Sequence, residues 1–496
     1  MKRRNFLISG AVATAGVAVF GANSLYSYDI FKQKRKFAVP PLYEGKKIGG
    51  KRVFNLNLQK GEMEFFKGLK TQTIGINAPF LGPTLRAKKG DMIQVNIKNS
   101  LGYDSTIHWH GFELPAKMDG GPHQIIKNGA TWSPEFAIKN RASMLWYHSH
   151  LLHQTGVQVY KGLAGLFILD DDESQNLNLP SEYGVDDIPI VLQDRNFNND
   201  GSFRYVSSQQ EKMMGIHGNY VLVNGVIAPT LEAKKKLTRF RILNGSNARY
   251  YLLGFSDNRK FQLIGSDGGL LEKPVTLGQI KLAPAQRIDI VVDLSDGKDV
   301  VLKSYKGALS QNMGMMGMMM GNMGFDIEFD LMKIQSKDAK NSNAKVPQNL
   351  IKHPVWNPKD AVGVRNIVLQ MRMGIGMMGG GNGEDNFFIN GKSMDMHRID
   401  AIAKKDTFEI WKVVNKSPMA HPLHIHNTQF KTLAINGRKP DASESGFMDT
   451  ISVDPMGIAY IMVPFRYYSD NKVPYMFHCH ILEHEDGGMM GQLLVT

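Results

Sequence analysis

Ten of the 15 histidines in this 496-residue chain lie in four short groups, and their spacing constrains the fold more than any other feature. The groups are His108-Trp109-His110, His148-Ser149-His150, His421-Pro422-Leu423-His424-Ile425-His426, and His478-Cys479-His480 followed by His484. In a β-strand the side chains alternate between faces with a rise of about 3.3 Å per residue, so histidines at positions i and i+2 share a face. Four His-x-His pairs therefore supply eight imidazoles, spaced to reach neighbouring metal ions of one cluster.

The chain has one cysteine, Cys479, and it lies inside the last His-x-His pair. If His478 and His480 point to one face of a strand, Cys479 points to the other. A cysteine with two histidines and a weak axial methionine is the ligand set of a blue-copper electron-transfer site. The residues left over to complete that set are His421, His484 and Met489. The sequence therefore predicts two metal centres that share one strand and are joined by a few covalent bonds.

Short alternating segments between turn signals predict an all-β protein. Examples are residues 92–97, 288–292 and 408–415, and the chain also contains 50 Gly and 21 Pro. A loose repeat, in which a strand ends in a turn at Asn99, Asn244 and Asn415, indicates three copies of one sandwich. Polar stretches at 170–180 and 336–358 mark the boundaries. We expect domains at residues 45–172, 185–335 and 355–496.

The N-terminal residues have the pattern of an export signal. Lys2, Arg3 and Arg4 precede an apolar run from residue 8 to about residue 20, which is too short to span a bilayer permanently. The adjacent arginines resemble a twin-arginine signal, so we expect residues 1–24 to direct export to the periplasm. No later run approaches 18 apolar residues, which predicts no stable membrane insertion. The formal net charge of +13 is accompanied by no nucleic-acid-binding motif, so we expect no nucleic-acid partner.

One His-x-His pair alone is a weak signal, but four pairs with the cysteine inside one of them are not expected by chance. With His-Trp-His-Gly at 108–111, His-Ser-His at 148–150, the histidine group at 421–426 and the segment 478–489, the sequence resembles the multicopper oxidases over nearly all of the mature chain. The resemblance implies three Greek-key β-sandwich domains of the cupredoxin type. It also implies metal sites within and between the first and third domains.

Four copper ions are implied by the same resemblance. Type 1 copper would be bound by His421, Cys479, His484 and Met489. Type 2 copper would be bound by His108 and His424, and the type 3 pair by His110, His148, His150, His426, His478 and His480. A substrate would be oxidised one electron at a time at type 1 copper, with Cys479 in the electron path. Dioxygen would be reduced to water at the trinuclear cluster.

Two acids resemble the residues that relay protons to the cluster in this family. Asp119 lies in a Met-Asp-Gly-Gly sequence, and Glu485 follows a predicted ligand directly. The alternatives are a turn residue for Asp119 and a surface charge for Glu485. The remaining five histidines lack paired spacing and are predicted not to bind metal; they are His123, His153, His217, His353 and His397. Of these, His153 lies three residues after His150, and we expect it to support that predicted ligand without binding metal itself.

The methionines indicate the substrate. Seven of the 28 lie between residues 313 and 323, and four more form a second Gly-Met segment, namely Met371, Met373, Met377 and Met378. Thioethers are soft ligands that favour Cu(I), and Gly-Met repeats have no apolar face to bury as core. The chain is thus similar to bacterial periplasmic cuprous oxidases. Unlike many of these, it has Ser417-Pro418-Met419 where an acid often precedes the type 1 histidine. We predict Met371 and Met419 as contacts for the substrate ion.

These observations predict an enzyme that oxidises Cu(I), with Fe(II) and phenols as further candidate reductants, and that serves copper tolerance. The main alternative is a laccase specialised for phenols, which would have an open organic pocket beside type 1 copper. A second alternative is a non-catalytic copper-binding cupredoxin protein. We expect a monomer.

Overall fold

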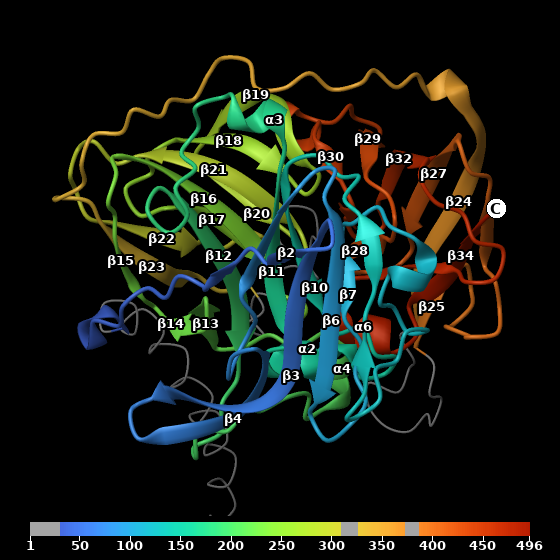
Figure 1. Ribbon diagram of the computed structural model, residues 1–496, viewed down its shortest axis with the longest axis horizontal. Coiled ribbons are helices and arrows are strands. Elements are labelled where there is room, and N and C mark those ends of the chain that lie inside the picture. The colour runs from blue at the N-terminus through green and yellow to red at the C-terminus, as the bar shows by residue number, and fades with distance from the viewer. Residues whose placement is uncertain (1–29, 309–325, 373–385) are drawn as a thin grey trace, which may run out of the picture.

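The computed structural model describes residues 30–308, 326–372 and 386–496. Within these ranges the chain forms six β-sheets, two in each of three successive domains (Figure 1). The all-β, three-sandwich prediction is confirmed. Three predicted features lie outside the described residues: the export signal at 1–24, the Met-rich segment at 313–323, and the methionines of the second segment beyond Met371. No helix of the described ranges has the length and apolar character needed to cross a bilayer.

The first domain pairs a five-stranded sheet, ordered β1-β5-β11-β10-β7, with a six-stranded sheet built on β2-β3-β6-β8. Its strands are β1 (Leu42–Tyr43), β2 (Lys46–Ile48), β3 (Lys51–Phe66), β4 (Leu69–Ile76), β5 (Thr84–Lys88), β6 (Met92–Ser100), β7 (His108–His110), β8 (Thr131–Trp132), β9 (Glu135–Ala137), β10 (Ser143–His148) and β11 (Ala164–Asp170). Its helices are η1 (Ile30–Gln33), η2 (Ala116–Met118), α2 (Thr155–Lys161) and α3 (Asp172–Gln175). Strand β6 has the alternation that the sequence predicted: every second residue, namely Ile93, Val95 and Ile97, is buried in the core.

The second domain pairs a seven-stranded sheet, β14-β13-β12-β16-β21-β18-β19, with a five-stranded sheet, β15-β23-β22-β17-β20. Its elements are β12 (Asp187–Arg195), α4 (Gln209–Met214), β13 (Tyr220–Val223), β14 (Val226–Ile227), β15 (Thr230–Glu232), β16 (Leu237–Asn244), β17 (Tyr251–Phe255), β18 (Phe261–Ser266), β19 (Gly269–Leu277), β20 (Gln279–Leu282), β21 (Arg287–Asp293), β22 (Val300–Ser304) and β23 (Phe329–Gln335). Its core contains the largest of the buried apolar clusters among the described residues.

The third domain pairs a six-stranded sheet, β25-β24-β27-β32-β29-β30, with a five-stranded sheet, β26-β34-β33-β28-β31. Its elements are η4 (Pro358–Asp360), β24 (Ala361–Met371), β25 (Phe387–Ile389), β26 (Ala401–Ala403), β27 (Thr407–Asn415), β28 (His421–Ile425), β29 (Phe430–Ile435), η6 (Ala442–Glu444), β30 (Phe447–Met448), β31 (Thr450–Val453), β32 (Ile458–Phe465), β33 (Tyr475–Cys479), α6 (Leu482–Asp486) and β34 (Met490–Val495). Helices α2 and α4 both pack against α6, so all three domains meet there.

The repeat seen in the sequence has a structural cause. Asn99, Asn244 and Asn415 are buried and make the same kind of bonds at the end of a strand. In each, the side-chain amide donates to backbone carbonyls of the following loop and of another segment, and Oδ1 accepts the N–H of the residue two positions later. One asparagine therefore shapes the same turn in every domain.

Strand pairing brings the histidine groups together. In the first domain His148 on β10 lies opposite His108 on β7, and in the third domain His478 on β33 lies opposite His424 on β28. Figure 1 shows β7 beside β28, and the rings of His108 and His426 stack with centroids 3.8 Å apart. The facing sheets of the first and third domains thus place all four groups around one interior space.

Candidate metal centres

A triad in the third domain unites His421, Cys479 and His484, all buried. Nδ1 of His421 lies 3.3 Å from the sulfur of Cys479, and Nδ1 of His484 lies 3.7 Å from it. The two Nδ1 atoms are 3.3 Å apart. Three potential ligand atoms therefore form a compact triangle, as the sequence predicted for type 1 copper.

Hydrogen bonds on the far side of both imidazoles determine which nitrogen is free. Nε2 of His484 lies 3.0 Å from the backbone oxygen of Met213, which can only accept, so Nε2 carries the hydrogen. Nε2 of His421 lies 2.6 Å from the hydroxyl of Ser417. That hydroxyl has one hydrogen, and it has oxygens of Asn415 and Met419 at 2.8 and 3.0 Å to receive it. Ser417 therefore accepts from His421, and both Nδ1 lone pairs point into the triad.

The triad suits a bound cation better than it suits its own empty state. Burial lowers the pKa of His484 to about 3 and that of His421 well below its usual value, so both imidazoles are neutral. Burial also raises the pKa of the Cys479 thiol. Two lone pairs facing each other beside a thiol cannot form hydrogen bonds to one another, whereas a soft cation would displace the thiol proton and bind all three atoms.

Met489, the predicted axial ligand, is buried in the same apolar cluster as Cys479. Its carbonyl accepts the N–H of Cys479 at 3.0 Å, and its own N–H donates to the carbonyl of His484 at 2.9 Å. These two bonds tie the methionine to the backbone of two triad members. The loop through α6 therefore returns Met489 to the triad.

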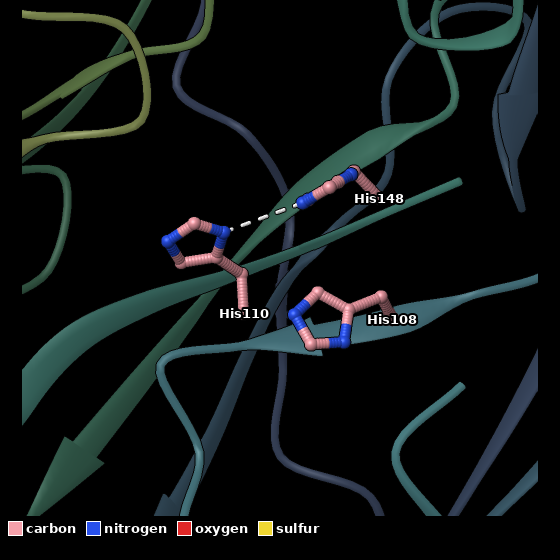
Figure 2. Close-up of side chains that lie close together, drawn as sticks. All are labelled: His108, His110 and His148. Carbon is pink, nitrogen blue, oxygen red and sulfur yellow. Dashed lines mark hydrogen bonds between the residues drawn. The ribbon is translucent and has the colours of Figure 1, made fainter. Parts of the chain in front are cut away.

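The other eight imidazoles form one buried cluster between the first and third domains. His108 stacks on His426, and His110 stacks on His424 with centroids 3.7 Å apart. Figure 2 shows the rings of His108, His110 and His148 close together, with Nδ1 of His110 3.4 Å from Nε2 of His148. Three triplets have ligand atoms within 4.8 Å of one another: His108, His110 and His148; His108, His424 and His426; and His150, His426 and His478.

Most of these rings have one nitrogen held by an oxygen that only accepts, which leaves the other nitrogen as a lone pair. Nδ1 of His108, His424 and His148 donates to the carbonyls of Asp119, Asp449 and Ser149. Nδ1 of His426 donates to the carboxylate of Asp119, Nδ1 of His478 donates to the carbonyl of Cys479, and Nε2 of His110 donates to the carboxylate of Asp449. In each of these six rings the other nitrogen therefore carries a lone pair that is free to bind a metal ion.

The inward nitrogens have no protein partner suited to them. Nε2 of His108 and of His424 is buried without a hydrogen bond, as are both ring nitrogens of His480. Nε2 of His478 faces Nε2 of His150 and of His426, each at 3.2 Å. Burial lowers the pKa of most of these imidazoles well below its usual value, so the rings are neutral; this holds for His110, His148, His150, His424, His426 and His480. Neutral imidazoles with converging lone pairs fit copper ions.

Cys479 connects the two centres as the alternation of a strand requires. It lies on β33 between His478 and His480, which belong to the eight-imidazole cluster, while its sulfur belongs to the triad. Register pairs β33 with β28, so His424 of the cluster and His421 of the triad lie on the neighbouring strand. The predicted arrangement of sulfur on one side and imidazoles on the other is present.

Both predicted acids contact the cluster. Oδ2 of Asp119 lies 2.6 Å from Nδ1 of His426. The carboxyl oxygens of Glu485 lie 3.3 and 3.1 Å from Nδ1 of His150 and of His478. Glu485 is fully buried, so the alternative of a surface charge is wrong.

Contributors that were not found from the sequence include Asp449 and Met213, besides Ser417. Asp449, between β30 and β31, bonds His110 through its carboxylate at 3.0 Å and His424 through its carbonyl at 2.8 Å. Met213, at the end of α4, caps His484 through its backbone. Neither belongs to a spaced motif: an Asp before a strand and a backbone carbonyl of a helix carry no distinctive pattern.

The five unpaired histidines lie outside the metal-competent groups of the described residues. Four of them donate from a ring nitrogen to an acceptor oxygen: His123 to the side-chain oxygen of Gln492, His153 to the carbonyl of Asp486, His217 to that of Gly215 and His353 to that of Leu270. His397 is exposed. The bond from His153 supports the end of α6 and does not reach His150.

The predicted substrate contacts lie in the apolar cluster around the triad. Met419 is buried there, and Met371 is half-buried and packs against it. Met213 also packs against this cluster, from the second domain. Thioether residues of two domains therefore belong to, or pack against, the apolar cluster that contains Cys479.

Comparison with known proteins agrees with this description. Family models described as multicopper oxidase match residues 57–174, 173–306 and 372–496. A multicopper oxidase of Staphylococcus aureus is 40% identical over 468 residues, 93% of each chain. The cell division protein FtsP of Photorhabdus laumondii is 33% identical over 485 residues, 97% of each chain.

Solved structures are similar over most of their length. A laccase-like multicopper oxidase, CueO, from Ochrobactrum sp., with oxidase activity towards lignin model compounds, has a TM-score of 0.83 and 35% identity. The similarity covers 92% of this chain and all of that one. A multicopper oxidase of Campylobacter jejuni, a metallo-oxidase, has a TM-score of 0.82 and 30% identity, over 94% of this chain and 96% of its own. The three sandwiches are thus of the cupredoxin type.

Proposed function

This chain belongs to the multicopper oxidase family and is a copper-dependent oxidoreductase that uses dioxygen as acceptor, and on this premise we propose that its reductant is Cu(I). The observation that carries the proposal is the covering of the triad. Ser417 caps Nε2 of His421, and the carbonyl of Met213 caps Nε2 of His484. Phe387 also stacks on the ring of His484, with centroids 4.4 Å apart. A phenol would need one of these imidazole edges, and within the described residues neither is open.

Thioether side chains are the second observation in favour of Cu(I). Met419 belongs to the apolar cluster that contains Cys479, Met213 and Met371 pack against this cluster, and the sequence adds seven methionines at 313–323. Soft sulfur ligands select Cu(I) over harder cations. A Cu(I) ion held by methionines next to the triad would pass its electron inward without touching an imidazole. The metallo-oxidase activity of the Campylobacter jejuni relative supports this choice.

The ligand sets named from the sequence are those we propose for four copper ions. His421, Cys479, His484 and Met489 would hold type 1 copper, and His108 with His424 type 2 copper. The type 3 pair would be held by His110, His148, His150, His426, His478 and His480. Bound there, copper supplies one-electron oxidation at the triad and four-electron reduction of dioxygen at the cluster. The protein's own part is to connect the two places, and residues 478–480 do so covalently.

Reduction of one dioxygen to two waters consumes four protons as well as four electrons. We assign their delivery to Asp119 and Glu485, which contact rings of the cluster directly. The carboxyl group of Glu485 lies within 3.3 Å of both His150 and His478, and its neighbour Asp486 accepts the N–H groups of Thr155 and Gly156 on α2. The carboxylates are held in place by the same histidines that they orient. Glu485→Gln and Asp119→Asn should therefore slow oxygen reduction while leaving copper reduction at the triad fast.

The export pattern at residues 1–24 supports a periplasmic location reached by the twin-arginine route. That route transfers folded proteins, so the residues that hold copper would already be brought together before export. Removal of Cu(I) in that compartment would serve copper tolerance. Fusion of residues 1–45 to a reporter that is active only after folded export tests the location, with Arg3→Lys and Arg4→Lys together as the inactive control.

Steady-state rates for Cu(I) and for a phenol test the reductant. Replacing Met213, Met371 and Met419 together with Leu should reduce kcat/KM for Cu(I) at least about 10-fold, because the ion loses soft ligands of similar volume. The phenol rate should stay the same or rise. The matched control is Met332→Leu, a buried methionine in the core of the second domain. Equal loss for both substrates, or none for Cu(I), would contradict the proposal.

Two alternatives keep a specific observation behind them. The activity of the Ochrobactrum relative towards lignin model compounds favours a laccase, which predicts a phenol rate above the Cu(I) rate in the unaltered protein. The similarity to FtsP, a cell division protein, leaves the non-catalytic alternative to be tested. Oxygen uptake by the copper-loaded chain, measured with an electrode, excludes that alternative.

A further inference from the structure

Arg287 of the second domain is fully buried and uses all five of its guanidinium N–H groups. Nε donates to the carbonyl of Met144 in the first domain at 3.0 Å. Nη1 donates to the carbonyl of Ala285 and Nη2 to that of Asp267, both in the second domain. The two remaining hydrogens form a fork on Asp449 of the third domain, at 2.7 and 2.6 Å. One side chain thus joins three domains.

Asp449 transmits this contact to the histidine cluster. The oxygen that accepts from Nη1 of Arg287 also accepts from Nε2 of His110 at 3.0 Å. The backbone oxygen of Asp449 accepts from Nδ1 of His424 at 2.8 Å. These bonds leave Nδ1 of His110 and Nε2 of His424 facing the cluster. Asp449 therefore orients one predicted type 3 ligand and one predicted type 2 ligand.

The surrounding residues are shaped for this pair. Asp267 accepts the backbone N–H of Arg287 at 2.7 Å and those of Asp449 and Thr450 at 3.3 and 3.4 Å, so it fixes both backbones. Gly111 follows His110 with φ +88°, and a Cβ there would lie 2.6 Å from Asp449 and 2.8 Å from Arg287. The glycine that ends the His-Trp-His-Gly sequence therefore leaves room for the contact between Arg287 and Asp449.

The geometry points to Arg287 as a positioning residue of the copper cluster, acting through Asp449 on His110 and His424. Without the guanidinium of Arg287, the buried carboxylate of Asp449 loses the two hydrogen bonds that fix its orientation. A lysine cannot form this two-pronged contact. The second domain provides no member of the metal-competent groups among the described residues, yet through Arg287 it decides how firmly the cluster holds copper. This inference rests on the copper cluster of the proposed function.

Arg287→Lys tests the inference with copper alone as the probe. Copper per chain is measured during titration with a chelator, together with the type 2 electron paramagnetic resonance signal and the blue band of the triad. Loss of a group that orients a metal ligand weakens metal binding about 10–100-fold. We expect that loss for the cluster copper, with the blue band retained.

The matched control is Arg241→Lys. Arg241 lies on β16 of the same domain, is also buried, and forms a two-pronged contact on Asp187 through Nε and Nη2 at 2.7 and 2.9 Å, away from the histidines. It should lower the melting temperature similarly but retain all the copper. Wild-type retention in Arg287→Lys, or an equal loss in Arg241→Lys, would overturn the inference.

If Arg287→Lys does not fold, Asp449→Asn breaks the same link with a side chain of equal size. Loss of cluster copper in that variant supports the inference, and full retention overturns it. The proposed function fails differently: the unaltered protein would then show no preference for Cu(I) whatever the two arginine variants do.

Discussion

The second and third domains use the same turn for different purposes. In the third domain Asn415 shapes the turn, and Ser417, two residues on, accepts from Nε2 of His421 at 2.6 Å. In the second domain Asn244 shapes the turn, and Ser246 pairs with the hydroxyl of Tyr251 at 2.8 Å. The asparagine serves the fold in both, whereas the residue that the serine reaches decides whether the turn serves a metal site.

The largest effect should come from the cysteine that only the third domain has. Cys479→Ser removes the sulfur from the triad while leaving the eight imidazoles in place. The blue absorption band and the oxidase turnover should both fall to background. Spectroscopy and oxygen uptake on the copper-loaded variant measure this. A variant that stayed blue and active would refute the assignment of the triad.

The next largest effect should come from removing copper, which should destabilise the first and third domains more than the second. Ligand that binds only the folded state stabilises it by about 4 kcal/mol when its free concentration exceeds Kd about 1,000-fold. Hydrogen exchange in the apo protein should therefore rise in β7, β10, β28 and β33, which hold the histidines, and change little in β16 and β17. The melting temperature should drop as well. Uniform loosening of all three domains would contradict this localisation.

Replacing the turn asparagines Asn415 and Asn244 should lower the unfolding free energy equally, but only one replacement should affect the triad. Asn415→Ala and Asn244→Ala each leave buried backbone carbonyls without a donor, at about 2–3 kcal/mol of unfolding free energy. Denaturant unfolding measures both. Only Asn415→Ala should also shift the blue band, because Ser417, which bonds His421 of the triad, loses its own hydrogen bond to Asn415. A band shift in Asn244→Ala would show that the second domain reaches the triad by another route.

The smallest effect is expected at the serines. Ser417→Ala removes the acceptor of His421 Nε2, and Ser246→Ala removes the partner of Tyr251, each at about 1 kcal/mol. The first should weaken copper at the triad and move its reduction potential, whereas the second should leave both unchanged. Redox titration of the blue band compares them. Identical potentials in the two variants would mean that Ser417 does not orient His421.

The candidate site divides into parts with and without a sequence signal. The ligand pairs follow a period of two and were predicted from the residues, whereas Asp119 and Glu485 were predicted from the resemblance to the multicopper oxidases. Asp449, Arg287 and Met213 were missed because each acts on a histidine at least 25 residues away in the chain, or through a backbone atom. No local pattern records a partner that is brought in by folding.

The amino-acid sequence by itself determined the all-β class, the copper chemistry and the alternation of sulfur and imidazole on one strand, because these depend on neighbouring residues and on the strand period. Tertiary structure alone decided which nitrogen of each ring is bare. That choice depends on acceptors from other strands and other domains, such as the carbonyl of Met213 and the fork of Arg287 on Asp449. A hydrogen bond spans about 3 Å, so only the folded chain can bring such groups into range.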